Sequence, residues 1–102
     1  MVLSSPHAGR VYPAEFIAAS IADVTALRGL EDFAVDQLIG SVCNHGITCI
    51  NNQISRAYID VNRPVDALDT AMFTSPPAAA NTAAAASRHV RAGYGLLPRL
   101  TA

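Results

Sequence analysis

Short β-prone runs alternate with helical patterns along this chain, and that alternation constrains the fold more than any other feature. Residues Val2 to Ser5 predict a short strand that Pro6 cuts off. Residues 47–50 and 55–59 predict two more strands, joined across the Asn-Asn pair at 51–52. Strands that alternate with helices indicate an α/β fold, with a layered sheet covered by flanking helices on at least one face.

Two stretches between these strands have helical spacing. The first begins at Pro13, which suits a first helical turn, and runs towards Leu27. The second is opened by Glu31 and Asp32, and Gly46 supplies its stop. Its apolar stripe recurs every three or four residues and consists of Val35, Leu38, Ile39 and Val42.

The pattern weakens from Pro64 onward. The Ala-rich residues 78–86 predict either a helix, by propensity, or a flexible insertion. At 102 residues the chain can make one small domain, and it has no internal repeat. We therefore expect a single domain.

Composition and charge exclude several classes of function. The chain is 51% hydrophobic with a formal net charge of −1, and it contains no Lys. Its seven basic residues are scattered Arg with no basic stripe, so nucleic acid is not an expected partner. No apolar run is long enough to cross a bilayer and the first residues do not resemble a signal peptide, so no membrane partner is expected and the cytoplasm is the default location.

Cys43 and Cys49 are the two cysteines of the chain, with five residues between them. This spacing matches no zinc or redox motif. Free Cys is among the most often buried residue types, so we expect two small buried thiols.

The stretch Asp60-Val61-Asn62-Arg63 suggests a clamp for a carboxylate. Arg offers two parallel N–H donors that match the two oxygens of a carboxylate, while Asn62 adds a donor and Asp60 can hold the Arg in place. A surface ion pair at a strand end explains the same residues.

Five sequence blocks, taken in order, resemble the N-formylglutamate amidohydrolase family from residue 3 to residue 99. The blocks are Pro6-His7-Ala8-Gly9-Arg10-x-Tyr12-Pro13, Glu31-Asp32-x-x-Val35-Asp36-x-Leu38, Asp60-Val61-Asn62-Arg63, Leu68-Asp69-x-x-Met72-Phe73 and Ala92-Gly93-x-Gly95-x-x-Pro98-Arg99. Each block is weak alone and the set is specific.

The resemblance implies a metal-dependent amidohydrolase, with Zn²⁺ or another divalent metal, that acts on N-formylglutamate or a similar N-acyl amino acid and releases the free amino acid and a carboxylate. It also implies a role in amino-acid catabolism, in histidine degradation. The implied fold resembles that of the zinc carboxypeptidases (phosphorylase/hydrolase-like), in which an Asn-Arg pair grips the substrate carboxylate.

Family members are longer than this chain, and their later Asp-x-His-Ser-Met-Pro motif has no counterpart here. We therefore interpret residues 1–102 as a single incomplete hydrolase domain, the amino-terminal part of a longer family domain. The general base is expected outside the chain, and an uncovered sheet edge favours self-association. An inactive truncated homologue or a carboxylate-binding module is the alternative.

His7 and Asp32 are the candidate metal ligands. His7 follows the first predicted strand, where it could bind zinc or form a hydrogen bond at a turn, and the resemblance favours zinc. Asp32 could be a second ligand or a helix N-cap. Asp36 lies one turn later on the same face, so we expect Arg10 or a metal between the two carboxylates and an ion pair as the role of Asp36.

Asn62, Arg63 and Arg10 are the candidate substrate-binding residues. We expect Asn62 and Arg63 to converge with His7 and Asp32 at the carboxyl end of the sheet. The Gly-x-Gly of the last block lacks the third glycine of a dinucleotide fingerprint and predicts a turn near the substrate. Arg88 and Arg99 lie nearby without an assigned role. Family members commonly carry Glu at the position of Ala67, which bears on substrate recognition in that loop.

Overall fold

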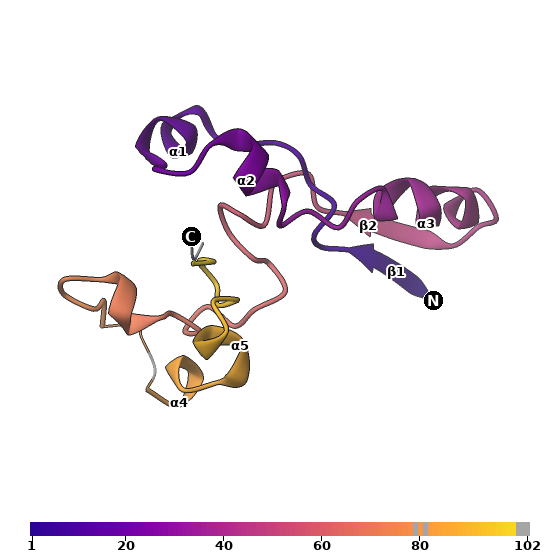
Figure 1. Ribbon diagram of the computed structural model, residues 1–102. Coiled ribbons are helices and arrows are strands. Elements are labelled where there is room, and N and C mark those ends of the chain that lie inside the picture. Colours follow the sequence, from indigo (N-terminus) through magenta and orange to yellow (C-terminus); the bar gives the residue numbers. More distant parts are fainter. Residues whose placement is uncertain (79, 81, 100–102) are drawn as a thin grey trace. The chain divides into compact units, whose positions relative to one another are not determined.

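The chain forms two compact units. The computed structural model describes residues 1–78, 80 and 82–99, and its contacts separate Met1–Tyr58, here called unit 1, from Ile59–Ala102, here called unit 2 (Figure 1). The predicted single incomplete domain is not tested by this division and stays a prediction.

Unit 1 contains a two-stranded parallel sheet with a helix against it. Strand β1 (Val2–Ser5) pairs with β2 (Thr48–Asn51), and the register runs from Val2 opposite Thr48 to Ser5 opposite Asn51. Helix α3 (Val35–Cys43) contacts both strands and lies along the sheet (Figure 1). The predicted α/β class and the first strand are confirmed, while β2 begins one residue later than its apolar pattern predicts.

The loop after β1 packs against the segment that follows β2. Val11 forms an isolated parallel bridge with Ile54, and the side-chain amide of Asn52 donates to the backbone oxygen of Pro6 at 3.0 Å. Gly9 lies so close to this segment that a Cβ atom there would overlap the backbone oxygen of Ile54. A glycine at position 9 is therefore required for the two loops to meet.

The third predicted strand, residues 55–59, is wrong. Residues 56–58 form a turn, in which the backbone oxygen of Ser55 accepts from the N–H of Tyr58 at 3.1 Å. The Ser55 hydroxyl also accepts from the N–H of Ala57 at 3.2 Å. A serine side chain that bonds to nearby backbone competes with strand pairing, and here it outweighs the β propensity of the run.

The first predicted helix is in fact two, α1 (Ala14–Ala19) and α2 (Val24–Arg28). Pro13 occupies the N-cap position of α1 instead of its first turn. The Ser20 hydroxyl accepts from the N–H of Ala22 at 3.2 Å, and the Asp23 carboxylate caps α2 by accepting from Ala26 at 2.8 Å. These local side-chain bonds interrupt a pattern that was continuous by apolar spacing alone.

The second predicted helix begins later than expected. Ala34, at the N-cap of α3, has a left-handed backbone (φ 57), so Glu31 and Asp32 precede the helix and Asp32 is not its cap. Gly46, with φ +81, follows the end of α3 as predicted. The apolar stripe is only partly covered, because Leu38 is 73% exposed.

Cys43 and Cys49 form a disulfide, so the prediction of two free buried thiols is wrong. Cys43 ends α3 and Cys49 lies in β2, and both are half-buried. The turn at Gly46 returns the chain so that the two Cα atoms lie 5.8 Å apart, within the usual range for a disulfide. The spacing of the two cysteines in the sequence does not by itself indicate that the chain turns back at Gly46.

Unit 2 is built from short helices around a small apolar core. It contains a 3-10 helix η1 (Thr70–Met72), α4 (Thr82–Ala85) and α5 (Arg88–Arg91), and α4 packs on α5 (Figure 1). The buried apolar residues of the unit are Ala67, Leu68 and Val90. Of the Ala-rich segment predicted as helix or insertion, residues 82–85 are helical, and residues 79 and 81 lie outside the described residues.

The Gly-x-Gly segment crosses the middle of unit 2. A Cβ atom at Gly95 would lie 2.7 Å from the backbone oxygen of Ala67, and that oxygen accepts from the N–H of Leu96 at 2.8 Å. The backbone oxygen of Leu96 in turn accepts from the N–H of Asp60 at 2.8 Å. This glycine permits a close backbone crossing.

Across both units, the described residues include no helix long and apolar enough to span a membrane.

Candidate functional site

His7 and Asp32 lie side by side in unit 1, just beyond the carboxyl end of β1. The backbone oxygen of His7 accepts from the N–H of Asp32 at 3.0 Å. This bond fixes the two side chains against each other, with His7 Nδ1 at 3.5 Å from Asp32 Oδ2. The imidazole is 11% exposed and the carboxylate 45%. The structure therefore brings the two predicted metal ligands together.

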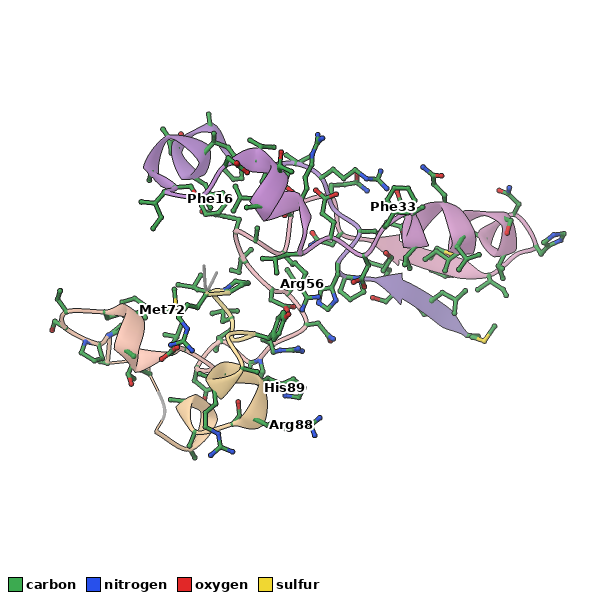
Figure 2. The ribbon with its side chains drawn as sticks, in the orientation of Figure 1. Phe16, Phe33, Arg56, Met72, Arg88 and His89 are labelled. Carbon is green, nitrogen blue, oxygen red and sulfur yellow. A yellow bond between two sulfur atoms is a disulfide. The ribbon has the colours of Figure 1, made fainter. Side chains whose placement is uncertain are left out.

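Arg56 adds a third ionisable group that sequence reasoning missed. Its Nη1 atom lies 3.9 Å from Asp32 Oδ1, and its side chain is 11% exposed (Figure 2). The turn at 56–58 gives Arg56 this position, whereas a strand was predicted there. Once residues 56–58 are known to form a turn, the positive charge of Arg56 can be matched with the acidic pair Glu31-Asp32, and that match could have identified it.

The geometry of the His-Asp pair suits two ligands of one metal ion. In a tetrahedral zinc site with Zn–N and Zn–O distances of about 2.0–2.2 Å, two ligand atoms lie roughly 3.4 Å apart, close to the observed 3.5 Å between Nδ1 and Oδ2. Among the described residues, however, no three His, Cys, Asp or Glu side chains group together. A catalytic zinc uses about three protein ligands, so the pair alone falls one ligand short of such a site.

Arg10 pairs with Asp36, which confirms the expected ion pair. The shorter contact joins Arg10 Nη2 and Asp36 Oδ1 at 3.0 Å, and a second joins Nη1 and Oδ2 at 3.5 Å. Asp36 lies in the first turn of α3, where a negative charge also favours the helix dipole. Arg10 lines an open cavity of about 330 Å³ together with Arg28, Glu31 and Phe33.

Tyr12 anchors the segment that carries Asp32. Its hydroxyl donates to Glu31 Oε1, one residue before the candidate ligand. Burial raises the pKa of Tyr12 above its usual 10.0, and the hydrogen bond to Glu31 raises it further. The phenol therefore stays protonated and keeps donating to Glu31 at neutral pH.

Asn62 and Arg63 lie on a tight turn of unit 2 that Asp60 builds. The Asp60 side chain is fully buried, and its Oδ1 atom accepts from the N–H of Asn62 at 2.9 Å. Its backbone oxygen accepts from the N–H of Arg63 at 3.1 Å. An Asp that bonds to the backbone two residues later is a common way to form such a turn.

Two backbone carbonyls fix the guanidinium of Arg63. Its Nε donates to the oxygen of Tyr94 at 2.8 Å, and its Nη1 donates to the oxygen of Asn62 at 2.8 Å. Within the described residues its Nη2 atom makes no hydrogen bond. The Gly-x-Gly block, expected to form a turn near the substrate, thus contributes the Tyr94 carbonyl that orients this Arg.

The two Arg left unassigned differ in their surroundings. Arg99 pairs with Asp69 at 3.1 Å and donates to the backbone oxygen of Arg91 at 3.4 Å, so it holds the end of unit 2 in place. Arg88 is exposed on α5 (Figure 2). Because the predicted metal pair lies in unit 1 and the Asn-Arg pair in unit 2, their convergence on one cleft stays a prediction.

A parallel α/β sheet with ionisable side chains just past a strand end is an arrangement common to many α/β enzymes and ligand-binding proteins. The family model for N-formylglutamate amidohydrolase matches residues 1–102, and the chain belongs to that family. No curated protein matches the chain.

A solved structure supports this assignment. The chain is similar to the N-formylglutamate amidohydrolase from Ralstonia eutropha JMP134, with a TM-score of 0.80 and 38% identity. The match covers 95% of this chain and 33% of that one, so the chain spans about a third of the length of its relative.

Proposed function

We propose that this chain contributes to an enzyme that hydrolyses the formyl amide of N-formylglutamate, or the amide of a similar N-acyl amino acid. The observation that carries the proposal is the family match over the whole sequence, residues 1–102. We further propose that the two-stranded sheet belongs to a larger layered sheet of the zinc-carboxypeptidase type.

His7 and Asp32 are the residues that would hold Zn²⁺ or another divalent metal. Their backbone hydrogen bond and the 3.5 Å between Nδ1 and Oδ2 support this role. When bound, such a metal supplies a Lewis acid for the acyl group and a water of lowered pKa. Arg56 balances the charge of Asp32 and limits its movement. Residues other than His7 and Asp32 would provide the third ligand and the general base.

Asn62 and Arg63 orient the substrate through its carboxylate. Arg63 is held by two carbonyls before any ligand arrives, so little side-chain entropy is lost when it donates to an anion. A carboxylate can accept from Nη2 and from the amide of Asn62. Arg10, already paired with Asp36, is proposed to add positive charge at its cavity in unit 1.

A carboxylate-binding module without turnover is the second candidate. It is favoured by the two-member ligand group, because a catalytic zinc needs about three protein ligands. Such a module would keep the oriented Arg63 and bind its ligand without any metal.

A chimera separates the two candidates. In the chimera, this chain replaces the matching third of the Ralstonia eutropha enzyme, to which it is 38% identical. If the proposal is right, the purified chimera releases formate from N-formylglutamate, and the release stops when His7 is replaced by Ala. A folded chimera that binds N-formylglutamate without releasing formate would favour the binding module.

A further inference from the structure

Unit 2 contains a cavity that the sequence motifs did not suggest. It has a volume of about 170 Å³. Its lining residues are Arg63, Pro64, Ala67, Ala84, Ser87 and His89. Most of this lining is apolar, and Arg63 and His89 are its basic members. Ligand pockets commonly combine an apolar wall with a few placed polar groups.

Tyr94 connects the two basic residues of the cavity. Its backbone oxygen accepts from Arg63 Nε at 2.8 Å, and its backbone N–H donates to the oxygen of His89 at 2.8 Å. Arg63 and His89 come from distant parts of the sequence, a turn and helix α5, and this one residue bonds to the side chain of Arg63 and to the backbone of His89. Figure 2 shows His89 on α5 beside Arg88.

The charge of the cavity favours an anion. The described residues that line it include no carboxylate. Unit 2 as a whole carries four Arg against three Asp. Two of these Asp are engaged elsewhere, since Asp69 pairs with Arg99 and Asp60 accepts from the backbone of Asn62. An anion in the cavity would thus meet donors from Arg63 and His89 without a competing carboxylate from the described lining residues.

The size of the cavity limits what the anion can be. At roughly 30 Å³ for each water-sized group, about 170 Å³ holds five or six non-hydrogen atoms. A carboxylate with two carbon atoms behind it has about this size. The carbon atoms would lie against the apolar wall, while the oxygens face the two basic side chains.

We propose that this cavity is the subsite for the carboxylate that Arg63 binds, and that His89 is a further hydrogen-bond donor to it, in addition to Arg63 and Asn62. His89 is then a specificity residue that selects substrates with a carboxylate on a short aliphatic chain. The identity of the natural ligand rests on the proposed function. Binding of a carboxylate in the cavity does not, because it needs neither metal nor turnover.

The test is a titration of the ¹⁵N-labelled 102-residue chain, followed by NMR at Arg63 Nε–H and at the His89 ring. The probes are glutarate, N-formylglutamate and the uncharged isostere glutaramide. Both carboxylates are expected to shift the two signals with saturation, and glutaramide is expected to leave them unchanged. Equal binding of glutaramide, or no shift with either carboxylate, would overturn the subsite.

Variants of unit 2 test the part assigned to His89. The variant His89→Ala is expected to weaken glutarate binding about tenfold to a hundredfold, the loss of one hydrogen bond to a charged group, and His89→Gln is expected to restore part of it. Arg88→Ala is the matched control, since it removes a neighbouring charge that does not line the cavity. Equal affinity of His89→Ala and the unaltered chain would refute the assignment.

The fold of each variant is checked from the amide signals of Leu68 and Val90, which are buried in unit 2. These signals should stay in place in all three variants. Failure of the chimera to release formate would count against the hydrolase proposal and leave the glutarate result unaffected, so the two claims fail separately.

Discussion

The carboxylate of Asp32 lies between an imidazole and a guanidinium, and each neighbour is placed by backbone bonding. The N–H of Asp32 donates to the oxygen of His7, and the turn after Ser55 brings Arg56 alongside. Arg63 is oriented in a similar way, by the carbonyls of Asn62 and Tyr94. At the scale of single residues, the candidate site therefore depends on main-chain geometry as much as on side-chain type.

Arg63→Ala should remove the main contact to the substrate carboxylate. In the active chimera, loss of the charge-assisted hydrogen bond from Nη2 is expected to cost about 1.5–3 kcal/mol of transition-state stabilisation, or roughly ten- to a hundred-fold in kcat/KM. Steady-state kinetics with N-formylglutamate measure this. Arg88→Ala, an exposed Arg of the same unit, serves as the control and should retain the unaltered kcat/KM. Unchanged kinetics for Arg63→Ala would mean that this Arg serves only the fold.

Tyr12 should make the chain lose stability in alkaline solution. Burial is the main cause that raises its pKa in the folded state. The folded chain therefore holds the phenol proton more tightly than the unfolded chain does. This contribution is fully present below the unfolded pKa of 10.0 and is lost as pH rises through the raised value. Urea unfolding between about pH 9 and 12 measures the slope. Tyr12→Phe should flatten it, and an unchanged slope in that variant would contradict the account.

Several site residues could be predicted from sequence and others could not. The Arg10–Asp36 pair was predicted, but from a wrong premise: Asp32 precedes α3 and does not lie one helical turn before Asp36, and its own charged neighbour is Arg56. Arg56 and His89 were not predicted, since their positions depend on a turn and on a short helix that follow no apolar pattern. A resemblance in motifs indicates which residue types matter, but it does not report which backbone carbonyls hold them.

At the scale of elements, local hydrogen bonds decided where apolar patterns failed. The hydroxyl of Ser20 split one predicted helix, and the hydroxyl of Ser55 turned a predicted strand. The patterns at β1 and α3 predicted the two elements, and α3 does pack against both strands, although Val2 and Leu38 stay largely exposed. The onset of α3 was missed because Ala34 adopts a left-handed backbone that the residue type does not indicate.

Gly9→Ala tests the packing of the loop after β1. A Cβ atom there would overlap the backbone of Ile54, so the substitution should destabilise the chain by about 3 kcal/mol, as overpacking does. Gly40→Ala is the matched control in unit 1: a Cβ atom at Gly40, inside α3, would meet nothing within 4 Å, and a gain of about 0.5–1 kcal/mol is expected. Urea unfolding compares the two. Similar stability for both variants would contradict the close approach at Gly9.

The disulfide between Cys43 and Cys49 should be detectable chemically. Without reductant, the denatured chain is expected to show no reactive thiol in a colorimetric assay, whereas Cys43→Ser should expose one, at Cys49. Closing a loop with a sequence separation of 6 stabilises the fold by about 2 kcal/mol in the chain-entropy model, and reduction should remove that amount. Two reactive thiols in the unreduced chain would restore the original prediction of free cysteines.

At the scale of the whole molecule, the chain spans about a third of the length of its structural relative, and unit 1 exposes several large apolar side chains. Phe33 is 92% exposed and Leu38 is 73% exposed. Uncovered apolar surface tends to associate, and the self-association expected from the sequence stays a prediction. The sequence could predict the α/β class, but not the division into two units, since no change in composition or linker marks residue 58.

The central claim is that His7 and Asp32 are two ligands of a metal centre, and that other residues provide its remaining parts. The measurement is a zinc titration of the 102-residue chain, with N-formylglutamate turnover assayed at zinc saturation. We predict weak zinc binding that His7→Ala removes, and no turnover, because two protein ligands leave too much of the coordination sphere to water. Zinc binding that survives His7→Ala, or turnover near that of an intact family enzyme, would contradict the account.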